Sequence, residues 1–385
     1  MTDTLRRVTL TAVTGLGLCL TLLPAGQAQA QAPTRVPCGD VAALKTAISD
    51  ANTNGGTIAL APRCTYSLTA ADNPDDGLPE ITGKVRITGD RTTVQRAPSA
   101  AASFRVFHVT QGGSLSLDSL TVRGGDASGS GFAAGGGGIF NDQGRLTLTD
   151  ATVRDNNAGF LGGGLWNNGG TLVLKNTTVR DNETQVAGGV ATTGTMTMRG
   201  GSLRDNTASF WGGGLGNAGD TTLNNVSVDG NNVGEGNGGL GGGIMTMSIS
   251  SGTGTQTGPL RLNSTQVRDN IAENSGGGIF IGFEEPTTLY KSVVTRNTAN
   301  GGPEQGGGIN NDGGRFGVII RPTGSSERQQ SKAGASAKQT LPEVNLIRSA
   351  VFKNHPTNCA PPGSVPRCDA VGSAPATNTP QADRS

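Results

Sequence analysis

The residues best suited to chemistry form a repeated Arg-Asp-Asn step. The step occurs four times, at Arg154-Asp155, Arg180-Asp181, Arg204-Asp205 and Arg268-Asp269. If the steps stack at the spacing of neighbouring strands, equivalent aspartates lie about 4.8 Å apart, close enough to share a cation. Catalytic sites are usually singular, whereas this pair recurs. The pattern therefore favours a neutral surface ladder, in which each arginine offsets an aspartate beside or above it.

A few charged residues break this regularity and are weak candidates for catalysis. At Asp229-Gly230 an aspartate takes the place of the arginine. That irregularity draws attention to three carboxylates, Asp205, Asp229 and Asp269. Further candidates fall in the less regular late repeats, where exposed loop charges are the simpler interpretation: Glu284, Glu285 and Arg315.

The two tryptophans are candidate ligand-binding residues. Trp166 follows Gly163-Gly164-Leu165, and alternation with an inward Leu165 predicts an outward indole. Trp211 lies just before the corresponding glycine run. A flat ring on an extended β-surface can pack on a sugar, although a surface tryptophan can also pack over a turn.

Several other chemistries lack their motifs. No glycine run is followed by the Lys-Ser/Thr of a phosphate-binding loop. The two histidines, His108 and His355, are isolated in the sequence and have no nucleophile motif or clustered cysteines nearby. We therefore expect no metal site and no cofactor.

The elements that must position these residues are repeats. An apolar residue stands three positions before an asparagine at Val153, Val179, Leu203, Val228, Val267, Val294 and Val351. Five positions before each of these stands a large apolar residue, namely Leu148, Leu174, Met198, Leu223, Leu262, Leu289 or Leu346. Alternating apolar residues predict strands with one buried face. The aligned asparagines predict an internal amide ladder that bonds neighbouring units at a bend.

Glycine pairs followed by an apolar residue keep the same phase. They begin at Gly137, Gly163, Gly188, Gly213, Gly242, Gly277 and Gly307, with periods near 25 that later lengthen. A unit of about 25 residues cannot bury its apolar face alone and must stack on its neighbours. Such units run parallel, and the crossover rule favours a right-handed coil. The predicted fold is all-β, a single right-handed parallel β-helix.

Both ends of the repeat array need covers. Residues 36–125 read as an N-terminal cap and the first coils, with a capping helix that begins after Asp40. Regular repeats occupy 126–354, interrupted by a polar loop at 324–340, and a disulfide-tied loop follows at 355–370. Four cysteines remain after the leader: Cys38, Cys64, Cys359 and Cys368. The simplest of three possible pairings is Cys38 with Cys64 and Cys359 with Cys368.

The termini indicate export. Residues 1–30 have two arginines, a short apolar run and small residues, as in a secretory signal peptide. Residues 371–385 are small and polar and include prolines, which predicts disorder. Removing the leader changes 30 basic and 29 acidic residues to 28 of each. We therefore expect a secreted, extracellular protein without a membrane span or a nucleic-acid partner.

The tandem Gly-Gly-(Gly)-Ile units with an apolar-x-x-Asn step resemble polymorphic outer-membrane-protein repeats. More broadly, the stretch from Gly135 to Asn354 is similar to bacterial β-helix proteins of the pectate-lyase-like superfamily. The resemblance implies the fold strongly and the activity weakly. Lyases of that superfamily use a carboxylate cluster for Ca²⁺, with arginine or lysine as the base, and the hydrolases use two or three aspartates.

Two functions remain open from the sequence. The first is an adhesin-like, monomeric protein that presents an extended Thr/Asn/Gly-rich surface to a polysaccharide or a cell-surface ligand. The alternative is an extracellular polysaccharide lyase or glycoside hydrolase, with Ca²⁺ as cofactor if it is a lyase. The absence of an unmistakable single carboxylate cluster favours binding.

Overall fold

The computed structural model of the protein describes residues 32–128, 134–234, 238–251, 254–313, 315–320, 326–331 and 341–368. The chain divides into two compact units, Met1–Ala32 and Pro33–Ser385. All described helices and strands belong to the second unit. The expected signal peptide, residues 1–30, and the expected disordered tail, residues 371–385, lie outside the described residues.

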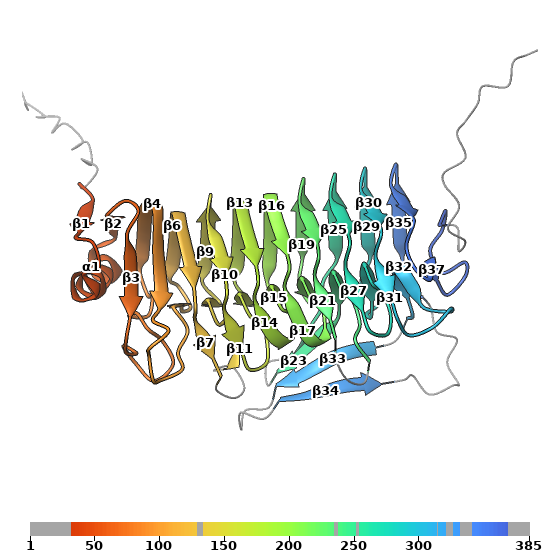
Figure 1. The fold of residues 1–385 in the computed structure, drawn as a ribbon, viewed down its shortest axis with the longest axis horizontal. Coiled ribbons are helices and arrows are strands. Elements are labelled where there is room, and N and C mark those ends of the chain that lie inside the picture. The colour runs from red at the N-terminus through yellow and green to blue at the C-terminus, as the bar shows by residue number, and fades with distance from the viewer. Residues whose placement is uncertain are drawn as a thin grey trace, which may run out of the picture. The chain divides into compact units, whose positions relative to one another are not determined.

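Successive coils of the second unit pass through three parallel sheets in turn, here named sheets A, B and C (Figure 1). The coil around β13, for example, contributes β13 to sheet A, β14 to sheet B and β15 to sheet C. The described strands of these three sheets pair in parallel, as in β13 with β16. The predicted parallel β-helix is therefore confirmed.

The described residues supply 17 strands to sheet A, 7 to sheet B and 9 to sheet C. Sheet A consists of β1 (Thr34–Val36), β2 (Gly56–Leu60), β3 (Thr65–Leu68), β4 (Lys84–Arg96), β6 (Ser114–Arg123), β9 (Arg145–Thr149), β10 (Thr152–Arg154), β13 (Thr171–Arg180), β16 (Thr195–Arg204), β19 (Thr221–Asn224), β20 (Ser227–Asp229), β25 (Leu260–Asn263), β26 (Gln266–Arg268), β29 (Thr287–Tyr290), β30 (Val293–Thr295), β35 (Val344–Ile347) and β36 (Ala350–Phe352). Sheet B consists of β7 (Asp126–Ala127), β11 (Asn157–Ala158), β14 (Glu183–Val186), β17 (Thr207–Trp211), β21 (Asn232–Val233), β27 (Ile271–Ala272) and β31 (Thr298–Ala299). Sheet C consists of β5 (Phe107–Val109), β8 (Ile139–Asp142), β12 (Leu165–Asn168), β15 (Val190–Thr192), β18 (Leu215–Asn217), β22 (Ile244–Thr246), β28 (Ile279–Ile281), β32 (Gly306–Asn311) and β37 (Thr357–Ala360).

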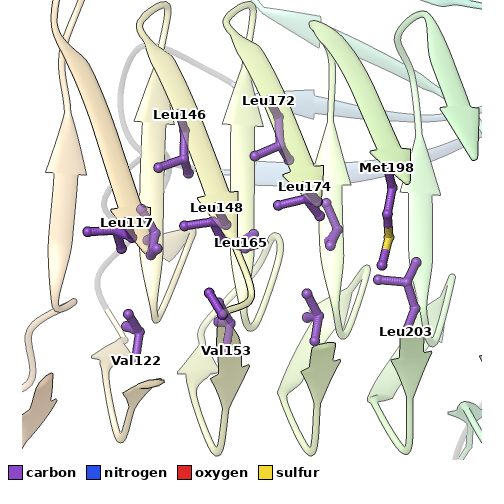
Figure 2. Close-up of a cluster of buried hydrophobic side chains, with 14 of the residues drawn as sticks. Leu117, Val122, Leu146, Leu148, Val153, Leu165, Leu172, Leu174, Met198 and Leu203 are labelled. Atoms are coloured by element: carbon purple, nitrogen blue, oxygen red, sulfur yellow. The ribbon is translucent and has the colours of Figure 1, made fainter. Parts of the chain in front are cut away.

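The apolar register of the sequence is the register of the core. Leu174 pairs with Leu148 on one side and with Met198 on the other, and all three side chains are fully buried. Figure 2 shows these residues stacked in rows from coil to coil. Because strand residues alternate between faces, the neighbours of each core residue point out of the coil. The outward face of sheet A is therefore polar, and it repeats from strand to strand.

A tight bend separates sheet A from sheet B in each regular coil. Asp155, Asp181, Asp205 and Asp269 occupy this bend with φ between 53° and 56°. Aspartate tolerates this left-handed backbone better than most residues, which explains its recurrence there. The asparagine that follows points inward, and its amide bonds the next asparagine along the stack. Distances from Nδ2 to Oδ1 run from 2.8 to 3.3 Å between Asn156, Asn182, Asn206, Asn231, Asn270, Asn297, Asn354 and Asn358. The predicted amide ladder is confirmed.

The N-terminal end of the stack is covered by α1 (Val41–Asn54). The Asp40 side chain accepts a hydrogen bond from the Ala43 amide at 2.8 Å and caps the helix. Leu44 and Ile48 are fully buried against the first coils. Both expected disulfides are present, with Cα–Cα distances of 5.6 Å for Cys38–Cys64 and 6.2 Å for Cys359–Cys368. Cys359 lies in β37, so part of the expected C-terminal loop is a strand of sheet C.

A fourth sheet lies outside the coils and was not expected from the sequence. This outer sheet consists of β23 (Ser248–Ser251), β24 (Gly254–Gln256), β33 (Arg315–Ile320) and β34 (Ser326–Ser331). The expectation of a loop at 324–340 is therefore wrong for Ser326–Ser331, which pair with β33 in antiparallel fashion. Residues 332–340 lie outside the described part of the chain. The inward side of the outer sheet contributes Ile249, Phe316 and Val318 to a second apolar cluster, separate from the core of the coils.

Candidate functional site

The repeated Arg-Asp step forms the neutral surface ladder that the sequence favours. Arg154 pairs with Asp155 and Arg180 with Asp181, and Arg204 donates to Asp205 at 2.6 Å. These side chains are partly exposed, so each pair contributes little to stability. Asp205, a candidate for catalysis, is thus neutralised by its own neighbour.

Asp229 and Asp269 are also occupied by arginines. Asp229 stands in the arginine row of sheet A, paired in register with Arg204 and Arg268, and Arg268 reaches it at 3.4 Å. Asp269 contacts Arg268 at 2.9 Å and Arg296 at 2.7 Å. The hydrogen bond from Arg296, aided by Arg268, lowers the pKa of the Asp269 carboxyl against the opposing effect of burial. The irregular aspartate at position 229 therefore maintains charge balance in the ladder.

The remaining charged candidates do not join this ladder. Glu284 and Glu285 lie between β28 and β29, and the Glu285 Oε1 accepts a hydrogen bond from the Thr257 hydroxyl at 2.9 Å. Arg315 begins β33 in the outer sheet, and its side chain lies outside the described part of the structure.

The expectation that Trp166 and Trp211 lie on the surface is wrong. Their side chains are 1% and 4% exposed, respectively. Trp166 does point away from the core, as alternation with Leu165 predicts, but it packs in the second apolar cluster and stacks on Phe140 at 4.7 Å. The outer sheet covers Trp211, whose ring meets Phe316 edge-on at 6.1 Å. A sugar could not stack on either ring without displacing its cover.

The space beside Gly135 is filled by the Trp166 ring and is not available to a ligand. A Cβ atom added at Gly135 would lie 2.0 Å from the indole Cε3 of Trp166. Gly135 must therefore remain without a side chain, because any Cβ atom there would clash with the Trp166 ring.

The outer face of sheet A presents long rows of polar side chains. One row crosses the strands through Lys84, Ser114, Arg145, Thr171 and Thr195. A second row runs through Thr88, Asp118, Thr149, Lys175, Arg199, Asn224, Asn263, Tyr290 and Ile347. Neighbouring members of a row are one strand apart, about 4.8 Å. A linear ligand that crosses the strands would therefore meet hydroxyl, amide and cationic groups at a regular spacing.

Four cations on these rows are exposed: Lys84, Arg145, Lys175 and Arg199. None of the four makes an ion pair within the described part of the chain, in contrast to Arg86, which contacts Asp118 at 2.8 Å. Lys175 and Arg199 are direct neighbours in register. Their like charges make this part of the face electropositive, although the whole chain is almost neutral.

A shallow hollow of about 340 Å³ lies at the N-terminal end of this face. It is lined by residues of β2, β4 and β6, including Lys84, Arg86, Ser114 and Ser116. Hydroxyl groups and cations that converge on a depression are suited to bind the hydroxyls and carboxylates of an acidic sugar. Sequence reasoning missed this hollow because β4 and β6 belong to the irregular early coils.

A larger cavity of about 390 Å³ lies near the C-terminal end, lined by Gln305, Asn310, Asp312, Thr357 and several prolines among other residues. Its charged lining residues are Glu304 and Asp312, so it offers no cation to an acidic ligand. The hollow on sheet A, which is lined by Lys84 and Arg86, is the better match for an anionic polymer.

Tyr290 is an aromatic residue of the sheet A face that sequence reasoning also missed. It is half-buried and stands one strand beyond Asn263 on the row of Lys175 and Arg199. The Lys291 ammonium lies 5.2 Å from its ring centre. The alternation Thr288-Leu289-Tyr290 already placed Leu289 in the core, and the same alternation predicts that Tyr290 points outward.

A separate charged cluster lies beside the N-terminal end of sheet C. Asp76 and Arg105 form a parallel bridge, and their side chains are each only 2% exposed, with 3.4 Å between Oδ1 and Nε. His108 Nδ1 lies 3.2 Å from Asp76 Oδ2 and 3.6 Å from Glu80 Oε1. Burial lowers the pKa of the Arg105 guanidinium, and Asp76 is the strongest of the carboxylates that oppose this shift. Sequence reasoning treated His108 as isolated because Asp76 is 32 residues away, one irregular coil earlier.

Comparisons with known proteins identify no family for this chain. No family model matches the chain, and no curated protein matches it. Among solved structures, the chain is similar to the pectate lyase Pel9A, with 13% sequence identity and a TM-score of 0.41 over 84% of this chain and 83% of that one. A likeness at this level carries no conclusion about activity. The β-helix implied by the sequence resemblance is confirmed by the strand pairings themselves.

The described residues contain no helix that is both long and apolar enough to cross a membrane.

Proposed function

We propose that the protein is an extracellular β-helix protein that binds an acidic polysaccharide across the outer face of sheet A. The observation that carries this proposal is a set of four exposed cations that make no ion pair with any residue the structure describes. They lie among rows of hydroxyl and amide side chains. The adjacent hollow at Lys84 and Ser114 adds a concave place for one sugar unit.

The geometry of the face suits a polymer better than a small molecule. Each contact on an open surface is weak, since water screens the charges. A chain of linked sugars would make many such contacts at once, and the linkage would raise their combined affinity. Regular strands supply equivalent groups at a fixed spacing, which a repetitive ligand can use.

Two further features support the proposed location and ligand. Both cysteine pairs form disulfides, which persist in oxidising compartments. The outward polar rows are rich in threonine and serine, and their hydroxyl groups can donate and accept hydrogen bonds with sugar hydroxyls.

Immobilised glycans provide the direct test of the ligand class. Polygalacturonate and alginate serve as acidic polymers, and dextran serves as a neutral polymer. We expect retention of the protein on both acidic polymers at low salt, release as salt rises, and no retention on dextran. Retention on dextran that resists salt would contradict the electrostatic basis of the proposal.

The same mixtures test the enzymatic alternative. Each polymer is incubated with the protein, with and without Ca²⁺, and the solution is monitored for unsaturated products and for new reducing ends. The proposal expects neither product. Sustained turnover would instead assign the protein to the polysaccharide lyases or glycoside hydrolases.

Tyr290 allows a test that separates sugar contact from charge. Replacement of Tyr290 by alanine removes a ring from the sheet A face and leaves every cation in place. We expect weaker retention on polygalacturonate together with a melting temperature close to that of the parent. Unchanged retention would remove Tyr290 from the binding surface.

A further inference from the structure

We infer that Asp76, Glu80 and His108 form a binding site for one divalent transition-metal ion of the zinc type. The three side chains come from two neighbouring coils and bring one ligand atom each to within 4.8 Å of the others. The site lies beside sheet C, on residues other than those of the sheet A face. It therefore does not depend on the proposed glycan binding.

Two of the three distances between the ligand atoms match the coordination of zinc. Zinc binds nitrogen and oxygen ligands at about 2.0 to 2.1 Å in a tetrahedron, so two of its ligands lie about 3.3 Å apart. His108 Nδ1 is 3.2 Å from Asp76 Oδ2 and 3.6 Å from Glu80 Oε1. Calcium prefers six to eight oxygen ligands at longer distances, and an imidazole ligand disfavours it.

The local charge also calls for a cation. Four carboxylates, those of Asp76, Asp75, Asp142 and Glu80, act on the single guanidinium of Arg105. Asp76 is the most buried of them, and its Oδ1 makes no hydrogen bond within the described residues, although it faces Arg105 as an ion pair. A buried carboxylate is stable only when it is well paired. In the structure His108 Nδ1 lies within hydrogen-bond distance of Asp76 Oδ2. An ion bound to both atoms would replace that hydrogen bond, with Arg105 holding Oδ1 as an outer-shell group.

The ligands are held in place before any ion arrives. His108 lies in β5 and stacks on Phe140 with 4.9 Å between ring centres and 20° between planes. The backbone of Asp76 is bridged to that of Arg105. Glu80, with a side chain that is 46% exposed, is the outermost ligand and leaves that side of the site open to solvent. An ion could enter past Glu80, and its fourth position would be available to water.

Metal titration of the tag-free protein tests the site directly. Zn²⁺ binding is followed by calorimetry, and Co²⁺ is added to a second sample as a coloured substitute. We expect one ion per chain, visible absorption bands of tetrahedral Co²⁺, and a higher melting temperature with Zn²⁺ than with an equal concentration of Ca²⁺.

Two ligand variants and two matched controls identify the residues. Glu80→Gln changes an exposed side chain, and His108→Gln keeps a polar group of similar reach, so both should fold. Each should weaken Zn²⁺ binding roughly tenfold or more. His355→Gln and Glu183→Gln alter an exposed histidine and an exposed glutamate elsewhere and should bind as the parent does. The inference is overturned if the parent binds no Zn²⁺, if it prefers Ca²⁺, or if the ligand variants bind as tightly as the controls.

Discussion

At the scale of single residues, position in the coil decides what each side chain does. Asp155 and Asn156 are adjacent polar residues, yet the first lies in an exposed bend and the second is buried in a ladder of amides. The bend explains both roles, because it turns one side chain out to arginine and the next one in. The repeated polar step is therefore structural, and it leaves the chemistry to residues outside the repeat.

Replacement of Asn206 by alanine should destabilise the protein by about 3 kcal/mol, because it removes hydrogen bonds that each contribute about 1 kcal/mol and leaves buried partners unsatisfied. The Asn206 amide donates to Asn231 and to the Val179 carbonyl at 3.0 Å, and it accepts from Asn182 at 2.9 Å. Urea unfolding measures the loss. Asn224→Ala, on the outward face of β19, is the control and should cost under about 1 kcal/mol. Equal effects of the two changes would argue against the ladder.

Replacement of Asp269 by asparagine should destabilise the protein at neutral pH only. Arg296 and Arg268 hold the pKa of the Asp269 carboxyl below the usual value of 3.8. A lowered pKa in the folded state contributes stability above the unfolded pKa, and that stability is lost as the pH falls through the folded pKa. The effect should be small, since the pair is exposed, and salt should reduce it.

Asparagine accepts the left-handed backbone of position 269, so this change adds no strain. Melting temperatures of parent and variant, measured from neutral to acidic pH, should differ at neutral pH and converge below about pH 4. Asp181→Asn is the control, because one arginine rather than two contacts Asp181, and its effect should be smaller. A difference that persists unchanged at acidic pH would contradict the assignment.

At the scale of elements, each strand is stabilised by the strands above and below it. β13 pairs with β9 on one side and with β16 on the other. A defect in one inward residue therefore affects three coils, whereas an outward residue affects mainly its own surface. The outer sheet stabilises the coils in another way. Its residues Ile249, Phe316 and Val318 pack on apolar side chains that the coils alone would leave exposed.

Replacement of Leu174 by alanine should lower the free energy of unfolding by about 2 to 5 kcal/mol, since it leaves a cavity between Leu148 and Met198. Val173→Ala, the outward neighbour on the same strand, should cost under about 1 kcal/mol. Denaturant unfolding of both variants distinguishes the two faces of β13. A larger effect at Val173 than at Leu174 would reverse the assigned register.

At the scale of the whole molecule, the sequence predicted what repeats and missed what does not. Leu174 and Asn206 recur in phase, so alternation and spacing sufficed to place them in the core and in the amide ladder. Trp166 points out of the coil, as alternation predicts. Trp211 is covered by the outer sheet, whose strands carry no repeat. The pairing of β23 with β33 joins residues about 70 positions apart, and no local pattern indicates it.

The candidate sites also divide into features that follow from the repeat and features that do not. The outward rows of sheet A follow from alternation once the strands are placed, and so does the position of Tyr290. The hollow beside Lys84 and the cluster around His108 lie in early coils of unequal length, where residues that meet in space have no common period in the sequence. Their recognition required the three-dimensional register.

The central claim, that sheet A binds an acidic polysaccharide through its exposed cations, is tested most directly by the affinity of polygalacturonate for one double variant. Lys84→Ser with Arg145→Ser removes two cations from one row, where they lie two strands apart with Ser114 between them. Lys353→Asn removes one exposed cation from the bend after β36, where asparagine also accepts the left-handed backbone. At low salt the double variant should bind roughly tenfold more weakly than the parent, since each cation contributes up to about 1 kcal/mol, and Lys353→Asn should bind as the parent does. Equal affinity of all three proteins, or no binding by the parent, would contradict the claim.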